Sequence, residues 1–313
     1  MNFKKALVTG GNGNLGRLLA RDLRELGVST VQFDIPGSEP EQLWADEAIV
    51  TGDIRDTALI EDIFNQHKPD AVFHLASLLS GSSEANVSDA WDINATSSFK
   101  LIELAAGRKV ERFFFASTLA TYGAGVADPL PEDEPQWPDL FYGVTKVAVE
   151  RLGVYYKLKH ALDFRCLRFP LVLSPYAPPG ALTAYPSHAF KAAMRGETRF
   201  EFPVSGHIGT STLFLDDVIK SIVDYTKVDA SQLSRHVYSL HSYILTGHMV
   251  ERAIQDRFPE FKADYRPDAA AERMLGGLPD VVEDQFARDD WQWSPDFDFD
   301  KTVNAMFELF ARE

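Results

Sequence analysis

The chain has 313 residues, of which 45% are hydrophobic and 25% are charged. This balance is typical of a globular protein with room for a large α/β domain and a smaller partner domain. The formal net charge of −15 argues against nucleic acids and membranes as partners. No apolar run approaches the roughly 20 residues that a membrane-spanning helix needs.

Cysteine and histidine usage limits the chemistry further. The single cysteine, Cys166, cannot form an intramolecular disulfide, which favours a reducing compartment. The first expected strand begins at about residue 3, which leaves no room for a targeting segment, so we expect a cytoplasmic protein. The eight histidines are scattered without a cysteine or acidic cluster beside them, and we expect no metal site.

The first 34 residues predict a strand, a glycine-rich turn, a helix and a second strand that ends in an acid. Glycines at positions 10, 13 and 16 let backbone N–H groups approach a pyrophosphate at the amino end of the helix. Asp34 follows Gly16 by 18 residues, where a carboxylate binds both ribose hydroxyls and repels a 2′-phosphate, which favours NAD over NADP. The expected cofactor-binding residues here are Gly10, Asn12, Gly13, Asn14, Leu15, Gly16 and Asp34.

Short β-rich runs then alternate with helical segments, which predicts a parallel sheet with helices on both faces. The run 48–54 is expected to be a strand whose end, Asp53 and Ile54, contacts the adenine of the cofactor. Asp56 is expected to cap the helix that follows. The apolar run 70–80 is expected to be a central strand, buried on both faces, and its exit loop.

Small residues follow that central strand. Ala76 and Ser77 are expected to let the ribose and phosphates lie against the chain, and Leu75 beside them is also expected to contact the cofactor. Ser80 is expected to lie further out, within reach of a substrate. His74, inside the strand, is expected to be a buried histidine whose ring nitrogens bond the backbone.

A helix is expected over residues 87–106, with Asn94 inside it. For Asn94 a structural role and a proton-relay role both remain open. The next strand, 112–118, ends in two hydroxyl residues, Ser117 and Thr118.

Tyr142 and Lys146 stand four residues apart at the start of an expected helix, so they share one helix face. A fixed ammonium beside a phenol lowers the phenol pKa from about 10, which makes a tyrosine a usable base near neutral pH. Alone, this spacing also suits a surface tyrosine and a solvated lysine. After a cofactor turn and a strand ending in Ser117 and Thr118, the catalytic interpretation is favoured.

The second half of the chain offers a candidate lid. The run 163–174 is expected to be a strand leading into a loop, 175–185, that is rich in turn formers and covers a substrate; a purely connecting loop is the alternative. After the expected strand at 211–215, Asp216 and Asp217 are expected to cap the next helix rather than to act as a catalytic acid pair.

The tail is expected to contain a helix at 246–258, and Trp291 and Trp293 are expected to pack in the core. The whole pattern predicts a doubly wound Rossmann-type α/β fold. We expect an NAD-binding domain over residues 1–170 and a substrate-binding lobe over residues 171–313, with segments that return to the Rossmann sheet.

Together these motifs resemble the extended short-chain dehydrogenases/reductases, in the epimerase/dehydratase branch. Within that branch, four runs of the sequence resemble the short-chain-type L-threonine 3-dehydrogenases, namely 75–80, 142–146, 163–170 and 287–293. The motifs that carry the wider resemblance are Gly10 to Gly16, Asp34, Asp53-Ile54, His74-Leu75-Ala76, Asn94, Ser117-Thr118 and Tyr142-x-x-x-Lys146.

The resemblance implies an NAD enzyme that oxidises the secondary hydroxyl of a small β-hydroxy acid and forms a homodimer. It implies that Tyr142 is the base, that Lys146 holds the ribose and tunes Tyr142, and that Thr118 orients the reacting oxygen. It places Ser80, Thr183 and Tyr185 at the substrate, along with Thr118 and Tyr142. The remaining cofactor contacts that it implies are Asn94, Ser117, Phe169 and Leu171.

The sequence also departs from that family. Ala184 occupies the lid position where the family has an acid, which removes a partner for a substrate ammonium. Residues 211–214 read Ser-Thr-Leu-Phe instead of Pro-Met-Met-Tyr. Three alternatives therefore remain open: a D-erythronate-type sugar-acid dehydrogenase, a nucleotide-sugar 4-epimerase or dehydratase, and a redox-sensing protein that keeps only the cofactor fold.

Overall fold

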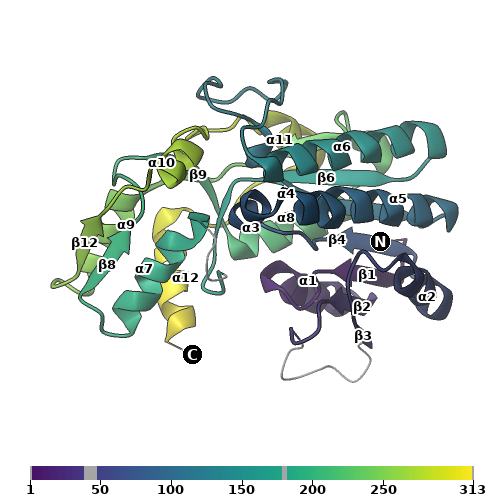
Figure 1. Cartoon of the computed structure of the whole chain (residues 1–313), viewed down its shortest axis with the longest axis horizontal. Coiled ribbons are helices and arrows are strands. Elements are labelled where there is room, and N and C mark those ends of the chain that lie inside the picture. Colours follow the sequence, from purple (N-terminus) through teal and green to yellow (C-terminus); the bar gives the residue numbers. More distant parts are fainter. Residues whose placement is uncertain (1, 39–47, 178–181, 312–313) are drawn as a thin grey trace. The chain divides into compact units, whose positions relative to one another are not determined.

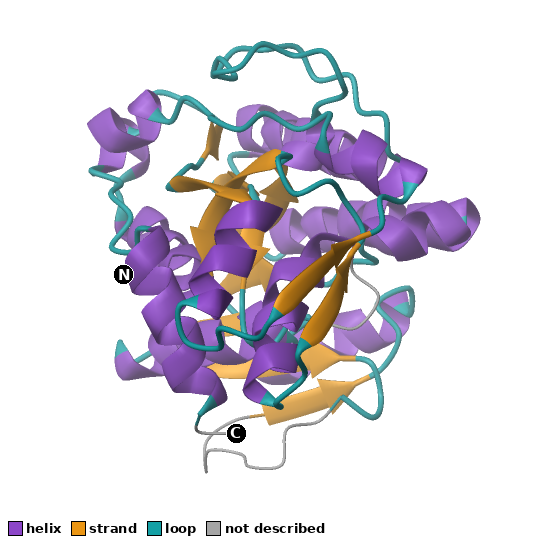
Figure 2. Ribbon diagram, turned by 90° about the vertical axis from the view of Figure 1, so that its left-hand side faces the viewer, coloured by secondary structure: helices purple, strands orange, loops and turns teal. Residues whose placement is uncertain are grey.

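The computed structural model describes residues 2–38, 48–177 and 182–311 (Figure 1). The chain forms two compact units, each built from several segments. The first contains residues 1–118, 141–168 and 219–238, and the second contains residues 119–140, 169–218 and 239–313. Figure 2 shows the helices and strands of the chain, coloured by type.

A seven-stranded sheet lies at the centre of the first unit, counted over the described residues. Its order is β10-β6-β5-β4-β1-β2-β3, the doubly wound arrangement that the sequence predicted. The pairs from β3 through β2, β1 and β4 to β5 are all parallel, so these five strands end at one edge of the sheet. The strands are β1 (Lys5–Thr9), β2 (Ser29–Asp34), β3 (Ala48–Thr51), β4 (Ala71–His74), β5 (Arg112–Thr118), β6 (Phe164–Phe169) and β10 (Val237–Ser239).

Helices cover this sheet. Apolar side chains of α2, α5 and α6 share a core with β1, β2, β4, β5 and β6, while α1 packs against β1 and β2. As expected, Asp56 caps α2, accepting a hydrogen bond from the Leu59 N–H at 3.1 Å. The helices are α1 (Asn14–Glu25), α2 (Thr57–His67), α3 (Ser80–Ala85), α4 (Val87–Ala90), α5 (Ser97–Gly107), α6 (Phe141–His160) and α8 (Leu215–Lys227).

The helix expected over 87–106 is interrupted. Between α4 and α5 the chain makes a π-helical turn, Trp91–Thr96, with Asn94 inside it. Such turns are often found at functional sites because they redirect a side chain out of the regular helical register. The sequence pattern does not reveal the turn, since its apolar spacing is compatible with a continuous helix.

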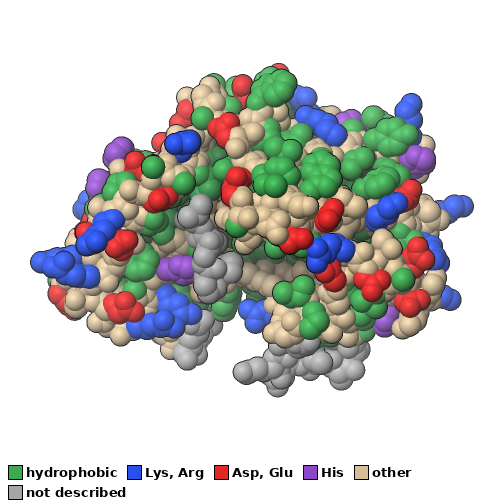
Figure 3. All heavy atoms as spheres, viewed as in Figure 1, with side chains coloured by type: hydrophobic (Ala, Val, Ile, Leu, Met, Phe, Trp, Pro, Cys, Tyr) green, Lys and Arg blue, Asp and Glu red, His purple; other side chains and the backbone are tan. Residues whose placement is uncertain are grey.

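Several apolar side chains of these helices are exposed to solvent. Tyr155 and Leu158 on α6 are 52% and 65% exposed, and Trp91, Val87 and Val144 are also exposed. Figure 3 shows hydrophobic side chains gathered over the region of α5 and α6. We call these five residues the exposed apolar face.

Within its described residues, the second unit holds two smaller sheets and a separate apolar core. One sheet has the order β11-β9-β7, and the other is a parallel pair of β8 and β12. The helix expected over 246–258 is present as α9. The elements are β7 (Leu171–Leu173), β8 (Arg199–Phe202), β9 (Gly209–Phe214), β11 (Tyr243–Thr246), β12 (Lys262–Tyr265), α7 (Tyr185–Met194), α9 (Gly247–Gln255), α10 (Ala269–Leu275), α11 (Gln285–Trp291) and α12 (Phe299–Phe310). Trp291 and Trp293 are buried, as predicted.

The prediction that Asp217 caps α8 is wrong. This residue lies in the first turn of the helix and is fully buried. Its two carboxylate oxygens accept hydrogen bonds from the backbone N–H groups of Asp296 and Phe297, at 2.8 and 3.0 Å. Asp217 therefore fixes the tail of the chain.

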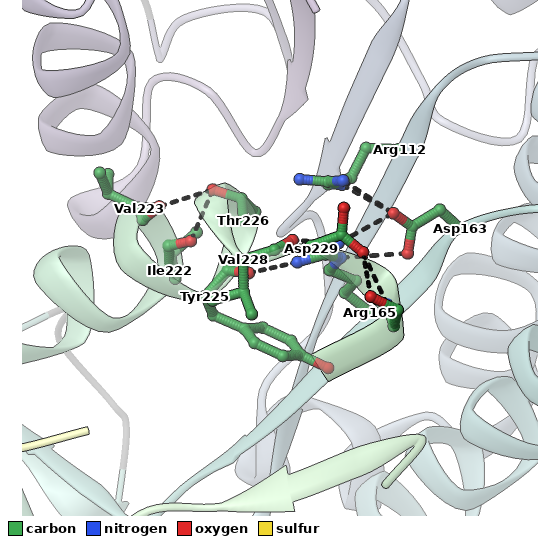
Figure 4. Close-up of polar contacts among 10 residues, drawn as sticks. Arg112, Asp163, Arg165, Ile222, Val223, Tyr225, Thr226, Val228 and Asp229 are labelled. Atoms are coloured by element: carbon green, nitrogen blue, oxygen red, sulfur yellow. Dashed lines mark hydrogen bonds and ion pairs between the residues drawn. The ribbon is translucent and has the colours of Figure 1, made fainter. Parts of the chain in front are cut away.

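A partly buried ionic cluster lies where β5 and β6 begin (Figure 4). Asp163 accepts from Arg112 at 2.8 Å and from Arg165 at 3.0 Å. Arg165 also donates to the carbonyl oxygens of Tyr225 and Val228, near the carboxyl end of α8. A cation at that end satisfies carbonyl groups that the helix leaves open.

Within the described ranges, no helix is both long and apolar enough to cross a membrane. The same ranges contain no group of three or more His, Cys, Asp or Glu side chains that could hold a metal ion.

Candidate active site

The glycine-rich turn follows β1 and brings two strand ends close together. Gly10 has φ +70°, and a β-carbon there would lie 2.8 Å from the backbone nitrogen of Ala76. A β-carbon on Gly16 would collide with the carbonyl oxygen of Gly10. Glycine is required at both positions, which explains why the chain can fold so tightly between β1 and α1.

The amino end of α1 suits an anion. Gly13 is its N-cap, no side chain among the described residues caps the helix, and its first turn contains no acid. The side-chain oxygen of Asn12 is buried and has no hydrogen-bond partner within the described part of the chain. A polar atom buried in this way is ready to meet a ligand, so these residues fit a dinucleotide such as NAD.

Asp34 ends β2 beside this turn. One carboxylate oxygen accepts from the Asn12 N–H at 2.9 Å, and the other accepts from the Ile35 N–H at 2.8 Å. A carboxylate has further lone pairs, so these bonds orient Asp34 and leave it able to accept from ribose hydroxyls.

Asp53 makes a contact that the sequence did not predict. Its carboxylate is bound by the Arg55 side chain, with the closest pair of atoms 2.6 Å apart, and this pairing lowers the pKa of Asp53. Arg55 also reaches Asp89 at 3.1 Å. The neighbouring Ile54 is buried.

His74 is fully buried in β4, as expected, but its partners are side chains and not the backbone. Nδ1 bonds the Thr9 hydroxyl at 2.6 Å and Nε2 bonds the Ser98 hydroxyl at 2.7 Å. Burial, aided by the charge of Lys146, lowers the pKa of His74 to about 3. A neutral histidine thus joins β1, β4 and α5.

Asn94 has a structural role in this arrangement. Its side-chain oxygen accepts from the Leu78 N–H at 2.8 Å, and its amide donates to the Leu78 carbonyl at 3.1 Å. The same amide lies 3.3 Å from the Thr145 hydroxyl, on α6. Asn94 therefore holds the loop after β4 and contacts the helix that carries Tyr142.

Tyr142 and Lys146 share one face of α6, as predicted. The Lys146 ammonium is buried, 5.3 Å from the centre of the Tyr142 ring, and donates to the Ala116 carbonyl at 2.9 Å. The strand end with Ser117 and Thr118 follows Ala116 directly. Helix and strand thus place a phenol, an ammonium and two hydroxyls at the carboxyl edge of the sheet.

The predicted lowering of the Tyr142 pKa is not found in this structure. Burial raises the pKa of Tyr142 to about 12, although a hydrogen bond with Ser77 opposes the shift. Burial also lowers the pKa of Lys146 to about 8.

Sequence reasoning missed a second buried charge on the same helix face. Glu150 lies four residues beyond Lys146, is fully buried, and accepts from the Ser117 hydroxyl at 2.5 Å. Arg168 binds both oxygens of this carboxylate. The spacing Tyr142, Lys146, Glu150 was available as a signal, because i, i+4 and i+8 lie along one helix face.

The other predicted substrate residues belong to different elements. Ser80 begins α3 in the first unit. In the second unit, Thr183 is partly buried, while Tyr185 is 4% exposed with its ring against Phe202. Ala184 is the N-cap residue of α7, and the lid residues 178–181 lie outside the described residues.

Two predicted cofactor contacts lie where β6 ends and β7 begins. These residues, Phe169 and Leu171, are both buried.

Comparison with known proteins gives a consistent result. The mitochondrial L-threonine 3-dehydrogenase of Sus scrofa is 31% identical over 311 residues, covering 98% of this chain and 83% of the relative. The structure of L-threonine dehydrogenase from Phytophthora infestans is 31% identical, with a TM-score of 0.91. The match covers 99% of this chain and 100% of the Phytophthora chain. A monomeric L-threonine 3-dehydrogenase from a metagenome is 28% identical, with a TM-score of 0.92. The match covers 98% of this chain and 99% of the metagenome-derived chain.

Residues 6–239 match the NAD dependent epimerase/dehydratase family. This match includes the glycine turn, Asp34 and the helix that carries Tyr142 and Lys146. It confirms the family expected from these motifs, and with it NAD as the cofactor. The chain belongs to the NAD dependent epimerase/dehydratase family and is a dehydrogenase of the extended short-chain dehydrogenase/reductase type.

Proposed function

We propose that the protein oxidises L-threonine to 2-amino-3-oxobutyrate, with reduction of NAD to NADH and release of a proton. The observation that carries this proposal is the shared helix face of Tyr142 and Lys146 beside the strand end at Ser117 and Thr118. The full-length similarity to proteins named L-threonine 3-dehydrogenase supports the choice of substrate.

In the proposed reaction, Tyr142 accepts the proton of the substrate hydroxyl, and Thr118 orients the oxygen that loses it. Lys146 contributes a positive charge that favours the phenolate form of Tyr142 and binds the ribose. When bound, NAD would accept a hydride from the substrate carbon that bears this hydroxyl. Two electrons leave the substrate as hydride, and one proton leaves through Tyr142.

The cofactor contacts that we propose extend over the carboxyl edge of the sheet. The glycine turn binds the pyrophosphate, Asp34 the adenosine ribose, and Asp53 with Ile54 the adenine. The full proposed set is Gly10, Asn12, Gly13, Asn14, Leu15, Gly16, Asp34, Asp53, Ile54, Leu75, Ala76, Ser77, Asn94, Ser117, Tyr142, Lys146, Phe169 and Leu171.

We propose that Ser80, Thr183 and Tyr185 bind the substrate together with Thr118 and Tyr142. The Tyr185 ring packs in the core of the second unit, so we propose that its hydroxyl is the group that binds the substrate. Residues 171–313 are proposed to supply most of the substrate specificity, and residues 1–170, together with Leu171, to bind the cofactor.

We also propose a cytoplasmic homodimer. The exposed apolar face is formed by side chains of α4, the π-helical turn and α6 in the first unit, which supports burial against a second copy. The single cysteine is buried and unpaired by disulfide, as suits a reducing compartment.

The test is NADH formation, followed by absorbance, with L-threonine, L-serine, 3-hydroxybutyrate and erythronate as substrates. We expect the largest kcat/KM with L-threonine. The family resemblance implies an acid at the position of Ala184, so the competing candidate is a hydroxy acid without an amino group. Turnover of erythronate or 3-hydroxybutyrate with none of L-threonine would replace the proposed substrate with that class.

A further inference from the structure

Glu150 is a buried carboxylate with a fixed set of partners. It is 0% exposed, and Arg168 donates to its two oxygens at 3.0 and 2.7 Å. A planar guanidinium that binds both carboxylate oxygens holds the group in one orientation. Removing a carboxylate from water is costly, so a buried pair of this kind suggests a role beyond stability.

The first consequence concerns Ser117. A serine hydroxyl has one hydrogen to donate, and Ser117 donates it to Glu150 at 2.5 Å. Toward any other group, Ser117 can then only accept a hydrogen bond. Glu150 thereby fixes both the rotamer of Ser117 and its hydrogen-bonding role.

The second consequence concerns Lys146, which lies one helical turn before Glu150. The negative charge of Glu150 acts against burial, the main cause that lowers the Lys146 pKa to about 8. Cys166 faces the same site from β6, but burial raises the pKa of its thiol well above the ordinary value, so it is neutral near pH 8. His74 and Tyr142 are also neutral there.

We propose that Glu150 is a positioning residue for the reaction: its carboxylate fixes the Ser117 hydroxyl and, held by Arg168, places a negative charge behind Lys146 that keeps the ammonium protonated. The part played by Lys146 rests on the proposed function. Glu150 itself acts through Ser117 and Lys146.

The test measures NADH affinity as a function of pH by fluorescence titration, which needs no turnover. Wild-type affinity is expected to fall as Lys146 loses its proton above a pH of about 8. In Glu150→Gln the side chain still offers Ser117 an acceptor but carries no charge. Its affinity is expected to fall about one pH unit earlier.

Three further variants separate charge from folding. Glu150→Asp keeps the charge, so its affinity is expected to fall near the wild-type pH. Glu150→Gln/Arg168→Met removes both charges of the pair and is expected to show a smaller shift in the same direction, even if the single variant folds poorly. Asp163→Asn breaks the partly buried ionic cluster of Figure 4 and is expected to leave the pH of the fall unchanged.

A folded Glu150→Gln protein that loses NADH affinity at the wild-type pH would overturn the inference. An equal shift in Asp163→Asn would overturn it too, because the effect would then follow from general destabilisation. Thermal unfolding of each variant establishes that it is folded. If NADH binds as described but L-threonine is not oxidised, the proposed substrate fails while the role of Glu150 stands.

Discussion

At the residue scale, the first unit is organised by buried polar side chains that pair with one another. His74 bonds Thr9 and Ser98, and Glu150 bonds Ser117 and Arg168. A buried polar group without a partner costs free energy, so each of these pairs also fixes the strand or helix that carries it. Buried polar pairs thus lie next to the reactive side chains.

His74 leads to a prediction about stability and pH. Its pKa is lowered from 6.5 to about 3 in the folded chain, so the native state requires the neutral ring. His74 therefore imposes no pH-dependent penalty on the unfolding free energy above pH 6.5. As the pH falls from 6.5 toward 3, the unfolding free energy falls, because the unfolded chain binds a proton that the folded chain does not. At pH 5 the loss is about 2 kcal/mol of unfolding free energy.

Urea unfolding of wild type and His74→Gln at pH 7 and pH 5 measures how much of the pH-dependent loss of unfolding free energy is due to His74. The variant is expected to be less stable at pH 7 but to lose about 2 kcal/mol less than wild type between the two pH values. An identical pH dependence in both proteins would show that His74 does not titrate as described.

At the element scale, the sequence predicted the local features well. The glycine turn, the cap at Asp56, and the doubly wound order follow from patterns that lie within a few tens of residues. The lowered pKa of Tyr142 was predicted from its spacing to Lys146 alone. It is not found because burial of the phenol, which raises its pKa, depends on the folded environment.

Long-range partners could not be predicted in the same way. Asp217 reads as a helix cap, yet it binds residues 296 and 297, far along the chain. Nothing near Asp217 in the sequence indicates that these amides will reach it. The π-helical turn around Asn94 was not predicted either, and the hydrogen bond of Asn94 with the Leu78 N–H is likewise a contact between distant parts of the chain.

Asp217 provides the prediction at this scale. In Asp217→Ala the N–H groups of Asp296 and Phe297 lose a charged acceptor inside the protein, so unfolding free energy is expected to fall by about 3 kcal/mol. The exposed neighbour is the matched control, and Asp216→Ala is expected to cost less than about 1 kcal/mol. Chemical denaturation measures both; equal effects would contradict the role assigned to Asp217.

At the scale of the whole molecule, the exposed apolar face predicts self-association. Light scattering coupled to size exclusion is expected to give the mass of two chains for wild type and of one chain for Tyr155→Glu/Leu158→Glu. Leu26→Glu, which changes an exposed leucine that follows α1, is the control and is expected to remain a dimer. A wild-type mass of one chain would contradict the proposed dimer.

The central claim is that Tyr142 accepts the proton when hydride leaves the substrate. Its most direct test compares wild type with Tyr142→Phe, using NADH binding by fluorescence and steady-state oxidation of the preferred substrate. We predict NADH affinity close to wild type and a kcat lower by about 100- to 10,000-fold, the usual contribution of a general base. A Tyr142→Phe protein that binds NADH normally and keeps near wild-type kcat would contradict the account.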